Sequence, residues 1–369
     1  MKINKRKIVD ALRLATLPLV PVYVLITVIR NFLFDVKIFP STKVEATVIS
    51  VGNLTVGGSG KTPLVIYLTK LLKQNGKKVA VLSRGYGRKT SGFVFVSDGN
   101  GIKTNIEDCG DEIYQTVLEC SVPAAVSESR VKGAKQLLAK SEVDTLVLDD
   151  AFQHRWIFRD LDILIFEQRF LLEASPLRRT FLPTGLLRED FSSTKRADII
   201  VLNRKFSEQK EIPERLQKYF KKDSKRCCGQ DRKVFTARYS AKGFFDIKKK
   251  TLYEAKEFEG QKSLVISGIA NPHSFFKALE QLNIDTENRM IFRDHKFYTS
   301  EDIQNIRKQF YATNVHSVIT TQKDAVKLMQ FKKELDDIDI FYLKIELQFD
   351  KEEEFTNEIF KKLSEPKKK

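Results

Sequence analysis

The chain has 369 residues, a length that predicts two or three folded domains. Of these residues 42% are hydrophobic and 30% are charged, a composition that excludes a disordered or fibrous protein. Its 64 lysines and arginines outnumber its 48 aspartates and glutamates, giving a formal net charge of +16, which predicts an anionic partner. The four cysteines form no Cys-x-x-Cys pair. The small number and the spacing of the cysteines argue against a disulfide framework and a zinc site, and they favour a reducing compartment. Cys227 and Cys228 have no predicted role.

The first predicted element is an apolar segment at residues 14–29 with basic residues on both sides. Its sixteen uncharged residues are fewer than the ~20 that cross a bilayer comfortably, Pro18 and Pro21 would bend a helix near its start, and no signal-peptide cleavage site follows. A short or tilted span, an interfacial helix and an ordinary buried helix remain open. A full span from a cytosolic domain would export the basic residues at 2–7, against the positive-inside tendency. We therefore expect residues 1–40 to form a membrane anchor on the cytoplasmic leaflet.

After this segment, apolar runs rich in β-branched residues alternate with helical patterns. Strands that are apolar throughout are typical of a parallel sheet covered on both faces, so residues 41–206 are predicted to form a doubly wound α/β domain. The predicted strands span residues 44–53, 77–85, 121–127, 144–150, 161–167 and 197–203, and the predicted helices span 63–75 and 130–140.

The second half of the chain predicts a smaller α/β subdomain at residues 234–369, behind a charged boundary or insert at 207–233. A strand at 234–240 begins it and is a candidate linker. The other predicted strands span residues 262–270, 289–295, 316–321 and 340–347, and the helices run from 271 to 282, from 300 to 311 and to the end of the chain.

The strongest local motif is TVGGSGKTP, at Thr55–Pro63, between a predicted strand and a predicted helix. Glycines let backbone N–H groups turn onto phosphate oxygens, while Lys61 would reach the β- and γ-phosphates and Thr62 would hold Mg²⁺. Thr55 replaces the first glycine of the usual pattern, and a glycine-rich turn without a ligand is the alternative. The predicted nucleotide-binding residues are Thr55, Val56, Gly57, Gly58, Ser59, Gly60, Lys61 and Thr62.

Two adjacent carboxylates, Asp149 and Asp150, end a neighbouring predicted strand. Acidic pairs often simply form turns, but beside a phosphate loop they are predicted Mg²⁺ ligands. The Asn-Lys-x-Asp pattern of guanine recognition is absent from LNRK at 202–205 and from TQKD at 321–324. We therefore expect ATP as the nucleotide.

Seven motifs occur in an order that matches a known family. They are SVGNLTVGGSGKTP (50–63), SRGYGR (83–88), GDE (110–112), LDDAFQHR (148–155), LPTGLLRE (182–189), FRDH (292–295) and TTQKDAVK (320–327). Together they resemble the tetraacyldisaccharide 4′-kinases, membrane-associated enzymes that phosphorylate the lipid A precursor disaccharide of Gram-negative bacteria. The resemblance extends from the anchor to about Lys327, most of the chain.

The resemblance implies two α/β/α subdomains joined by a β-ribbon, and Mg²⁺-dependent transfer of the ATP γ-phosphoryl group to a sugar 4′-hydroxyl. It implies an anionic glycolipid substrate and contact with inner-membrane lipid on the cytoplasmic face. It implies no protein partner, and we expect no nucleic-acid partner. Asp111 would be the general base, assisted by His295 when the subdomains close. The other implied site residues are Lys61, Arg188 and Glu189 at the phosphate and metal site, Arg130 at a phosphate, and Gln153 beside the metal carboxylates.

Two other classes of function are compatible with a phosphate loop. A membrane-tethered NTPase switch acting on a protein partner would hydrolyse nucleotide slowly with water alone, whereas a kinase needs its lipid acceptor. A nucleic-acid-binding ATPase fits less well, because the chain shows no interleaving of aromatic and basic residues that would build a stacking groove.

Overall fold

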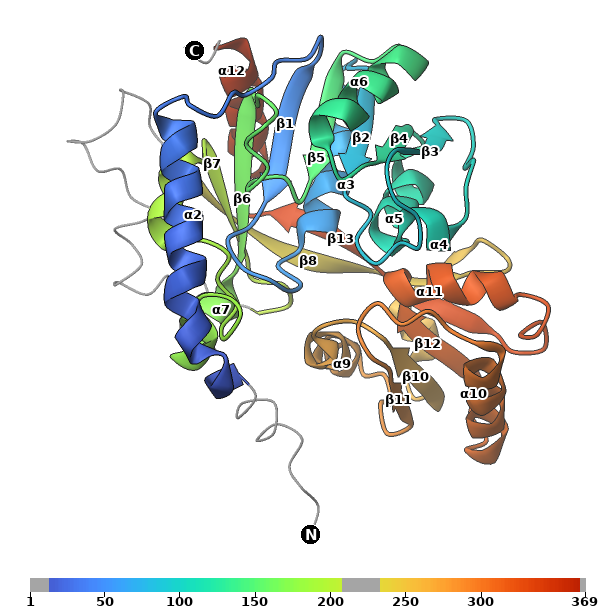
Figure 1. Ribbon diagram of the computed structural model, residues 1–369. Helices are drawn as coiled ribbons and strands as arrows, with labels where there is room; N and C mark the ends of the chain where they lie inside the picture. Colours follow the sequence, from blue (N-terminus) through green and yellow to red (C-terminus); the bar gives the residue numbers. More distant parts are fainter. Residues whose placement is uncertain (1–12, 208–232, 366–369) are drawn as a thin grey trace.

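The computed structural model describes residues 13–207 and 233–365 (Figure 1). The charged boundary at 208–232 with Cys227 and Cys228, the basic residues at 2–7 and the last four residues lie outside the described residues. Within them, one continuous sheet of thirteen strands runs through two lobes in the order β11-β10-β12-β13-β8-β7-β6-β1-β5-β2-β4-β3, with β9 paired to β8.

The first lobe contains a parallel sheet with one antiparallel edge strand. Its strands are β1 (Thr47–Gly52), β2 (Val79–Ser83), β3 (Val94–Asp98), β4 (Pro123–Val126), β5 (Thr145–Asp149), β6 (Leu161–Glu167) and β7 (Ile199–Asn203). All neighbours pair in parallel except β3, which runs antiparallel to β4. The predicted parallel α/β sheet is confirmed, with this edge and the ribbon described below as its antiparallel parts.

Helices cover both faces of this sheet. They are α3 (Lys61–Gln74), α4 (Ile106–Cys109), α5 (Asp111–Cys120), α6 (Arg130–Lys140) and α7 (Gln168–Glu173), with short 3₁₀ turns η2 (Leu177–Arg179) and η3 (Phe191–Arg196). Alternate strand residues face opposite sides: Ile49 packs with Leu68 of α3, and Val48 packs on the face that Leu137 of α6 covers. The sheet therefore holds the phosphate-loop motif between a buried strand and a buried helix.

A long antiparallel ribbon joins the lobes. It consists of β8 (Lys233–Asp246) and β13 (Ile340–Phe349), paired from Ala237↔Phe349 to Asp246↔Phe341 with an irregularity between Lys344 and Ile345. The first part of β8 pairs with β7, and the first part of β13 pairs with β12. The last helix, α12 (Glu352–Ser364), returns to the first lobe, where Phe355 is fully buried. Each end of the ribbon is thus part of a different lobe's sheet.

The second lobe has a three-stranded parallel sheet next to the ribbon. Its elements are β9 (Leu252–Tyr253), η4 (Ala255–Phe258), β10 (Ser263–Ser267), α9 (Pro272–Gln281), β11 (Arg289–Ile291), α10 (Ser300–Ala312), β12 (Ser317–Thr321), α11 (Gln322–Leu328) and η5 (Met329–Phe331). Phe276 of α9 packs on one face and Ile306 of α10 on the other. The strand predicted to reach residue 295 ends at Ile291, and a loop to residue 299 follows.

The N-terminal helix lies along the outside of the first lobe (Figure 1). It begins with the 3₁₀ turn η1 (Leu17–Leu19) and continues as α2 (Val20–Asp35), and Pro18 and Pro21 occupy first-turn positions where proline is tolerated. By length and composition, residues 13–35 could cross a membrane. Large apolar side chains cover its outward face, all of them exposed: Leu14, Leu17, Leu19, Val22, Leu25, Ile26, Val28, Ile29 and Phe32.

Candidate active site

The phosphate loop follows β1 and ends where α3 begins at Lys61. Gly57 and Gly60 have φ angles of 111° and 99°, a left-handed conformation that glycine adopts without strain. A Cβ on Gly60 would lie 2.2 Å from Asn203 Nδ2, whereas one on Gly57 or Gly58 would meet nothing within 4 Å. The loop is therefore packed at its end and open in the middle, where its amides can receive phosphate oxygens.

Side chains and backbone from three segments hold the loop in place. Asn53 Nδ2 donates to Ser59 Oγ at 2.9 Å, and Asn203 Nδ2 donates to the Ser59 carbonyl at 3.1 Å. The Val56 amide donates to the Leu186 carbonyl at 2.8 Å. Asn203 at the end of β7 is a site residue that the sequence interpretation missed, although its position at the carboxyl end of a parallel strand was a usable signal.

The predicted acidic pair lies at the carboxyl end of β5, next to the loop. Asp150 has a positive φ of 49°, and its Oδ1 is 3.7 Å from Lys61 Nζ. Arg188 Nη1 donates to both Asp150 oxygens, at 2.8 and 3.0 Å. The structure thus brings Lys61, Asp150 and Arg188 together, as expected from the sequence.

Asp149 has different surroundings. It is buried, its Oδ2 is 3.5 Å from Ser83 Oγ, and its Oδ1 has no hydrogen-bond partner among the described residues. Burial, with the nearby Glu112 and Asp150 charges, raises the pKa of Asp149. Burial also favours a higher pKa for Asp150, but Lys61 and Arg188 outweigh it and lower the pKa of that carboxyl.

A divalent cation suits this arrangement. The buried Asp149 Oδ1 lacks a partner, and the described residues contain no group of three His, Cys, Asp or Glu side chains arranged to hold a metal by themselves. Mg²⁺ is usually held by one or two carboxylates together with water and substrate phosphates. The donor set therefore fits Mg²⁺ bound jointly with a nucleotide, with Thr62 at the start of α3 as a further oxygen donor.

Gln153 and Arg130 have partners inside the first lobe. Gln153 Nε2 donates to the Asn53 carbonyl at 2.9 Å, and its Oε1 is 3.5 Å from Arg188 Nη1. Arg130 is buried and donates to the carbonyls of Ser127, at 2.7 Å, and Asp149, at 3.1 Å. Both side chains therefore brace backbone next to the acidic pair, and contact of Arg130 with a phosphate stays a prediction.

Glu189 is buried against the N-terminal helix. Its Oε1 is 2.8 Å from Arg30 Nη2 of α2, and its Oε2 pairs with Arg196 and accepts from Asn31 Nδ2 at 3.3 Å. Both carboxylate oxygens are thus engaged with groups of α2 and η3, and a role for Glu189 at the metal stays a prediction.

Asp111 and His295 form a pair that bridges the lobes. Asp111 begins α5 and is 4% exposed, while His295 lies in the loop after β11 with a positive φ of 55°. His295 Nδ1 is 3.2 Å from Asp111 Oδ1. Burial alone would raise the pKa of Asp111, but His295, Lys323 and Lys327 outweigh it and hold that pKa well below its usual range. The two lysines, on α11, were quoted only as motif letters in the sequence analysis.

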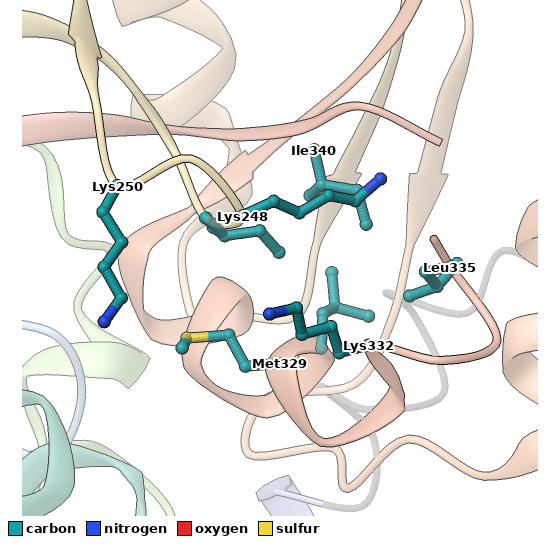
Figure 2. A pocket seen from close by; sticks show the side chains of 8 residues that line it. Lys248, Lys250, Met329, Lys332, Leu335 and Ile340 are labelled. Atoms are coloured by element: carbon teal, nitrogen blue, oxygen red, sulfur yellow. The ribbon is translucent and has the colours of Figure 1, made fainter. Parts of the chain in front are cut away.

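The second lobe also contains a hollow of about 230 Å³ away from these residues (Figure 2). Apolar side chains and three lysines line it. Its lining residues are Ile247, Lys248, Lys250, Leu328, Met329, Lys332, Leu335 and Ile340. None of the predicted site residues takes part in it.

Comparison with known proteins covers nearly the whole chain. The family model described as Tetraacyldisaccharide-1-P 4'-kinase matches residues 12–364. Tetraacyldisaccharide 4'-kinase of Halothermothrix orenii is 34% identical over 363 residues, 94% of this chain and 92% of the relative, and that of Flavobacterium johnsoniae is 36% identical over 328 residues, 88% and 89% of the two chains. A crystal structure of LpxK from Aquifex aeolicus in complex with ATP is 31% identical, with a TM-score of 0.74 over 95% of this chain and 99% of that chain.

Proposed function

This chain belongs to the tetraacyldisaccharide-1-P 4'-kinase family, and we propose that it transfers the γ-phosphoryl group of ATP to the 4′-hydroxyl of a tetraacyldisaccharide 1-phosphate. The observation that carries this proposal is the cluster of Lys61, Asp150 and Arg188 at the phosphate loop. The comparisons lend no support to the alternative of an NTPase switch.

The loop and its neighbours would bind and orient the nucleotide. Backbone amides near Gly57 and Gly58, where the loop is open, would bind the phosphates, and Lys61 would exchange its long contact with Asp150 for a γ-phosphate oxygen. Arg188 is held by Asp150, and its guanidinium group would stabilise the negative charge that develops on the transferring phosphoryl group. Thr62, Asp149 and Asp150 would hold Mg²⁺, which neutralises phosphate charge when it is bound.

Asp111 would accept the proton of the sugar hydroxyl. As the hydroxyl oxygen bonds to the γ-phosphorus, its O–H bond breaks, the proton moves to the carboxylate and ADP leaves with the electron pair of the cleaved P–O bond. His295 contacts Asp111 from the other lobe. Because Asp111 belongs to the first lobe and His295 to the second, the two side chains meet only when the lobes have the relative position seen in this structure.

The N-terminal helix would keep the enzyme at its substrate. We place it on the cytoplasmic face of the bacterial inner membrane, where its exposed apolar side chains enter the lipid. The net charge of +16 favours both an anionic leaflet and an anionic glycolipid. No nucleic-acid or protein partner is part of this proposal.

The direct test measures transfer of labelled phosphate from γ-labelled ATP to tetraacyldisaccharide 1-phosphate in detergent micelles, with and without Mg²⁺. We expect a Mg²⁺-dependent bisphosphorylated lipid, and a loss of at least about 10²-fold in Lys61→Ala, which lacks the phosphate-binding cation. Lys77→Ala, at an exposed lysine just after α3, is the matched control and should keep the parent rate. ATP hydrolysis without any lipid product would overturn the proposal and favour the switch.

A further inference from the structure

The hollow in the second lobe lies apart from the phosphate loop and from the Asp111–His295 pair. It has a volume of about 230 Å³ and forms where the turn after β8, the end of α11 and the start of β13 meet (Figure 2). Helices α2 and α11 lie on opposite sides of the molecule (Figure 1). A ligand of this hollow therefore comes from the surrounding water and not from a membrane that binds α2.

The lining of the hollow is aliphatic and cationic. Its eight residues are two leucines, two isoleucines, one methionine and three lysines, and lysine side chains also have aliphatic stems. None of these eight side chains has an aromatic ring, a hydroxyl, an amide or a carboxylate. The lining thus offers no stacking surface for a nucleobase and no hydrogen-bond pattern for a sugar, whereas an alkyl chain finds apolar contacts throughout.

The positive charge at the hollow has no acidic counterpart. Of the three consecutive lysines at 248–250, only Lys249, which does not line the hollow, pairs with a carboxylate among the described residues, at 3.9 Å from Asp246 Oδ2. Lys248 Nζ donates to a backbone carbonyl at 2.7 Å. Lys250 and Lys332 are exposed, and neither pairs with an acidic side chain of the described residues. Unpaired ammonium groups beside an aliphatic cavity favour an anionic head group.

The turn that carries two of these lysines is fixed by a buried carboxylate. Asp246 is 1% exposed, and its Oδ1 accepts from the Lys248 amide at 2.7 Å. The Asp246 carbonyl accepts from the Lys250 amide at 3.0 Å, and the Ile247 amide donates to the Ile340 carbonyl at 3.2 Å. The backbone on this side of the hollow is therefore in place before a ligand arrives, which lowers the entropic cost of binding.

We propose that this hollow is a binding site for a small, water-soluble aliphatic anion, whose chain contacts Leu328, Met329 and Ile340 and whose head group pairs with Lys250 and Lys332. Its volume of about 230 Å³ is below the ~300–1,000 Å³ of sites for drug-sized ligands. The ligand is therefore of the size of a medium-chain fatty-acid anion. The site is independent of the proposed transfer reaction, since none of the predicted site residues lines it.

Octanoate is the probe, and a methionine of the hollow reports its binding. The chain has three methionines, Met1, Met290 and Met329, so ¹³C-labelled methionine methyl groups give three NMR signals in the full-length protein in a non-ionic detergent. Met329 lines the hollow, whereas Met290 belongs to β11, which β10 and β12 separate from β13. Below its micelle-forming concentration, octanoate should shift the Met329 signal with a Kd of roughly 0.1–1 mM and leave the Met290 signal unchanged.

Two further probes separate the chain from the charge. Acetate keeps the carboxylate without the chain and should bind at least about 10-fold more weakly than octanoate, because it loses the apolar contacts. 1-Octanol keeps the chain without the charge and should bind about 3- to 30-fold more weakly, because it forms no ion pairs. If either probe binds as tightly as octanoate, the hollow does not select an aliphatic anion and the proposal is wrong.

A matched pair of double variants tests the lysines. Lys250→Gln with Lys332→Gln should weaken octanoate binding by about 3- to 30-fold, the combined effect of two exposed ion pairs. Lys249→Gln with Lys333→Gln makes the same change in net charge at adjacent exposed lysines that do not line the hollow, and it should keep the parent Kd. All four side chains are exposed, so both variants should fold.

The outcomes decide the proposal. A saturable shift of the Met329 signal that weakens in Lys250→Gln with Lys332→Gln, and not in the control variant, supports it. Equal weakening in both double variants would mean that octanoate responds only to the net charge, and it would overturn the site. The absence of a saturable shift of the Met329 signal in the parent protein would also overturn it, whether or not the protein phosphorylates the lipid.

Discussion

Asp149 and Asp150 are neighbours in the chain, yet their carboxylates have opposite surroundings. Asp150 turns to the cations of Lys61 and Arg188, whereas Asp149 is buried with one oxygen that has no partner among the described residues. The left-handed φ of 49° at Asp150 lets two adjacent side chains face different groups. At the scale of single residues, Asp149 thus keeps one oxygen available to a cation, while Asp150, the second proposed Mg²⁺ ligand, also orients the phosphate-binding side chains.

The available carboxylate can be tested with Asp149→Asn. Because the amide keeps the size but loses the negative charge, we expect the Mg²⁺ concentration for half-maximal activity to rise by about 10- to 100-fold. A Mg²⁺ titration of lipid phosphorylation measures it. Glu142→Gln, at an exposed carboxylate just before β5, controls for the loss of one charge, and an unchanged Mg²⁺ requirement in Asp149→Asn would remove this residue from the metal site.

Helix α2 is both an apolar surface and a support for the site. Tyr23 donates from its hydroxyl to the Arg188 carbonyl at 3.0 Å, and Arg30 pairs with Glu189 at 2.8 Å. One face of the helix therefore contacts the LPTGLLRE loop that carries Arg188, and the opposite face presents exposed apolar side chains. A large exposed apolar surface of this kind is typical of a membrane-binding site.

We expect Ile26→Glu to weaken membrane binding. Ile26 is 61% exposed on α2, and Ile291, in the second lobe, is 59% exposed, so Ile291→Glu is a matched control. Insertion of an isoleucine side chain into lipid is worth about 1.5–3 kcal/mol, so the partition coefficient should fall roughly 10- to 100-fold in Ile26→Glu alone. Co-sedimentation with vesicles containing an anionic phospholipid measures this. Equal losses in both variants would show that α2 has no special role in binding.

For the whole molecule, the important feature is how the lobes meet. Besides the ribbon, Glu119 of α5 joins the lobes. Within the first lobe it pairs with Lys70 of α3 at 2.9 Å. It also accepts from Gln322 Nε2 of α11 at 2.5 Å and is 3.8 Å from Lys344 of β13. Burial alone would raise the pKa of Glu119, but these contacts outweigh it, so its pKa lies below the ordinary value of 4.5. The ionised carboxylate thus stabilises the contact of α5 with α11.

Glu119→Gln should lower stability in a pH-dependent way. A group with a depressed folded-state pKa stabilises fully above its unfolded pKa and loses this contribution as the pH falls through the folded value. We therefore expect a loss of roughly 1–3 kcal/mol at neutral pH that shrinks progressively below about pH 4.5. Thermal unfolding at several pH values measures this, with Glu142→Gln as the exposed control. A loss that is constant with pH would mean that the ionised carboxylate is not what stabilises the contact.

The sequence by itself determined the elements that form through interactions between residues close together in the chain. The glycines of the phosphate loop, the apolar run of β6 and the helical pattern of α6 predicted those elements, and β6 and α6 have the predicted bounds. The ordered motifs also identified the family, which the comparisons confirm. The short α5 at residues 111–120 and the edge strand β3 were not predicted, because brief and partly polar segments gain their structure from packing.

Only the tertiary structure decided which distant residues meet. Strand β8 extends to Asp246, beyond its predicted end, because β13 pairs with it antiparallel, and the order of strands brings α11 to α5. That placement sets Lys327 against Asp111, 216 residues away in sequence, at 3.3 Å, and it sets Arg30 of the N-terminal helix against Glu189. Hydrophobic periodicity encodes which side chains are buried, but strand order and register decide their neighbours, so the partners that tune the acid–base pair follow from the fold.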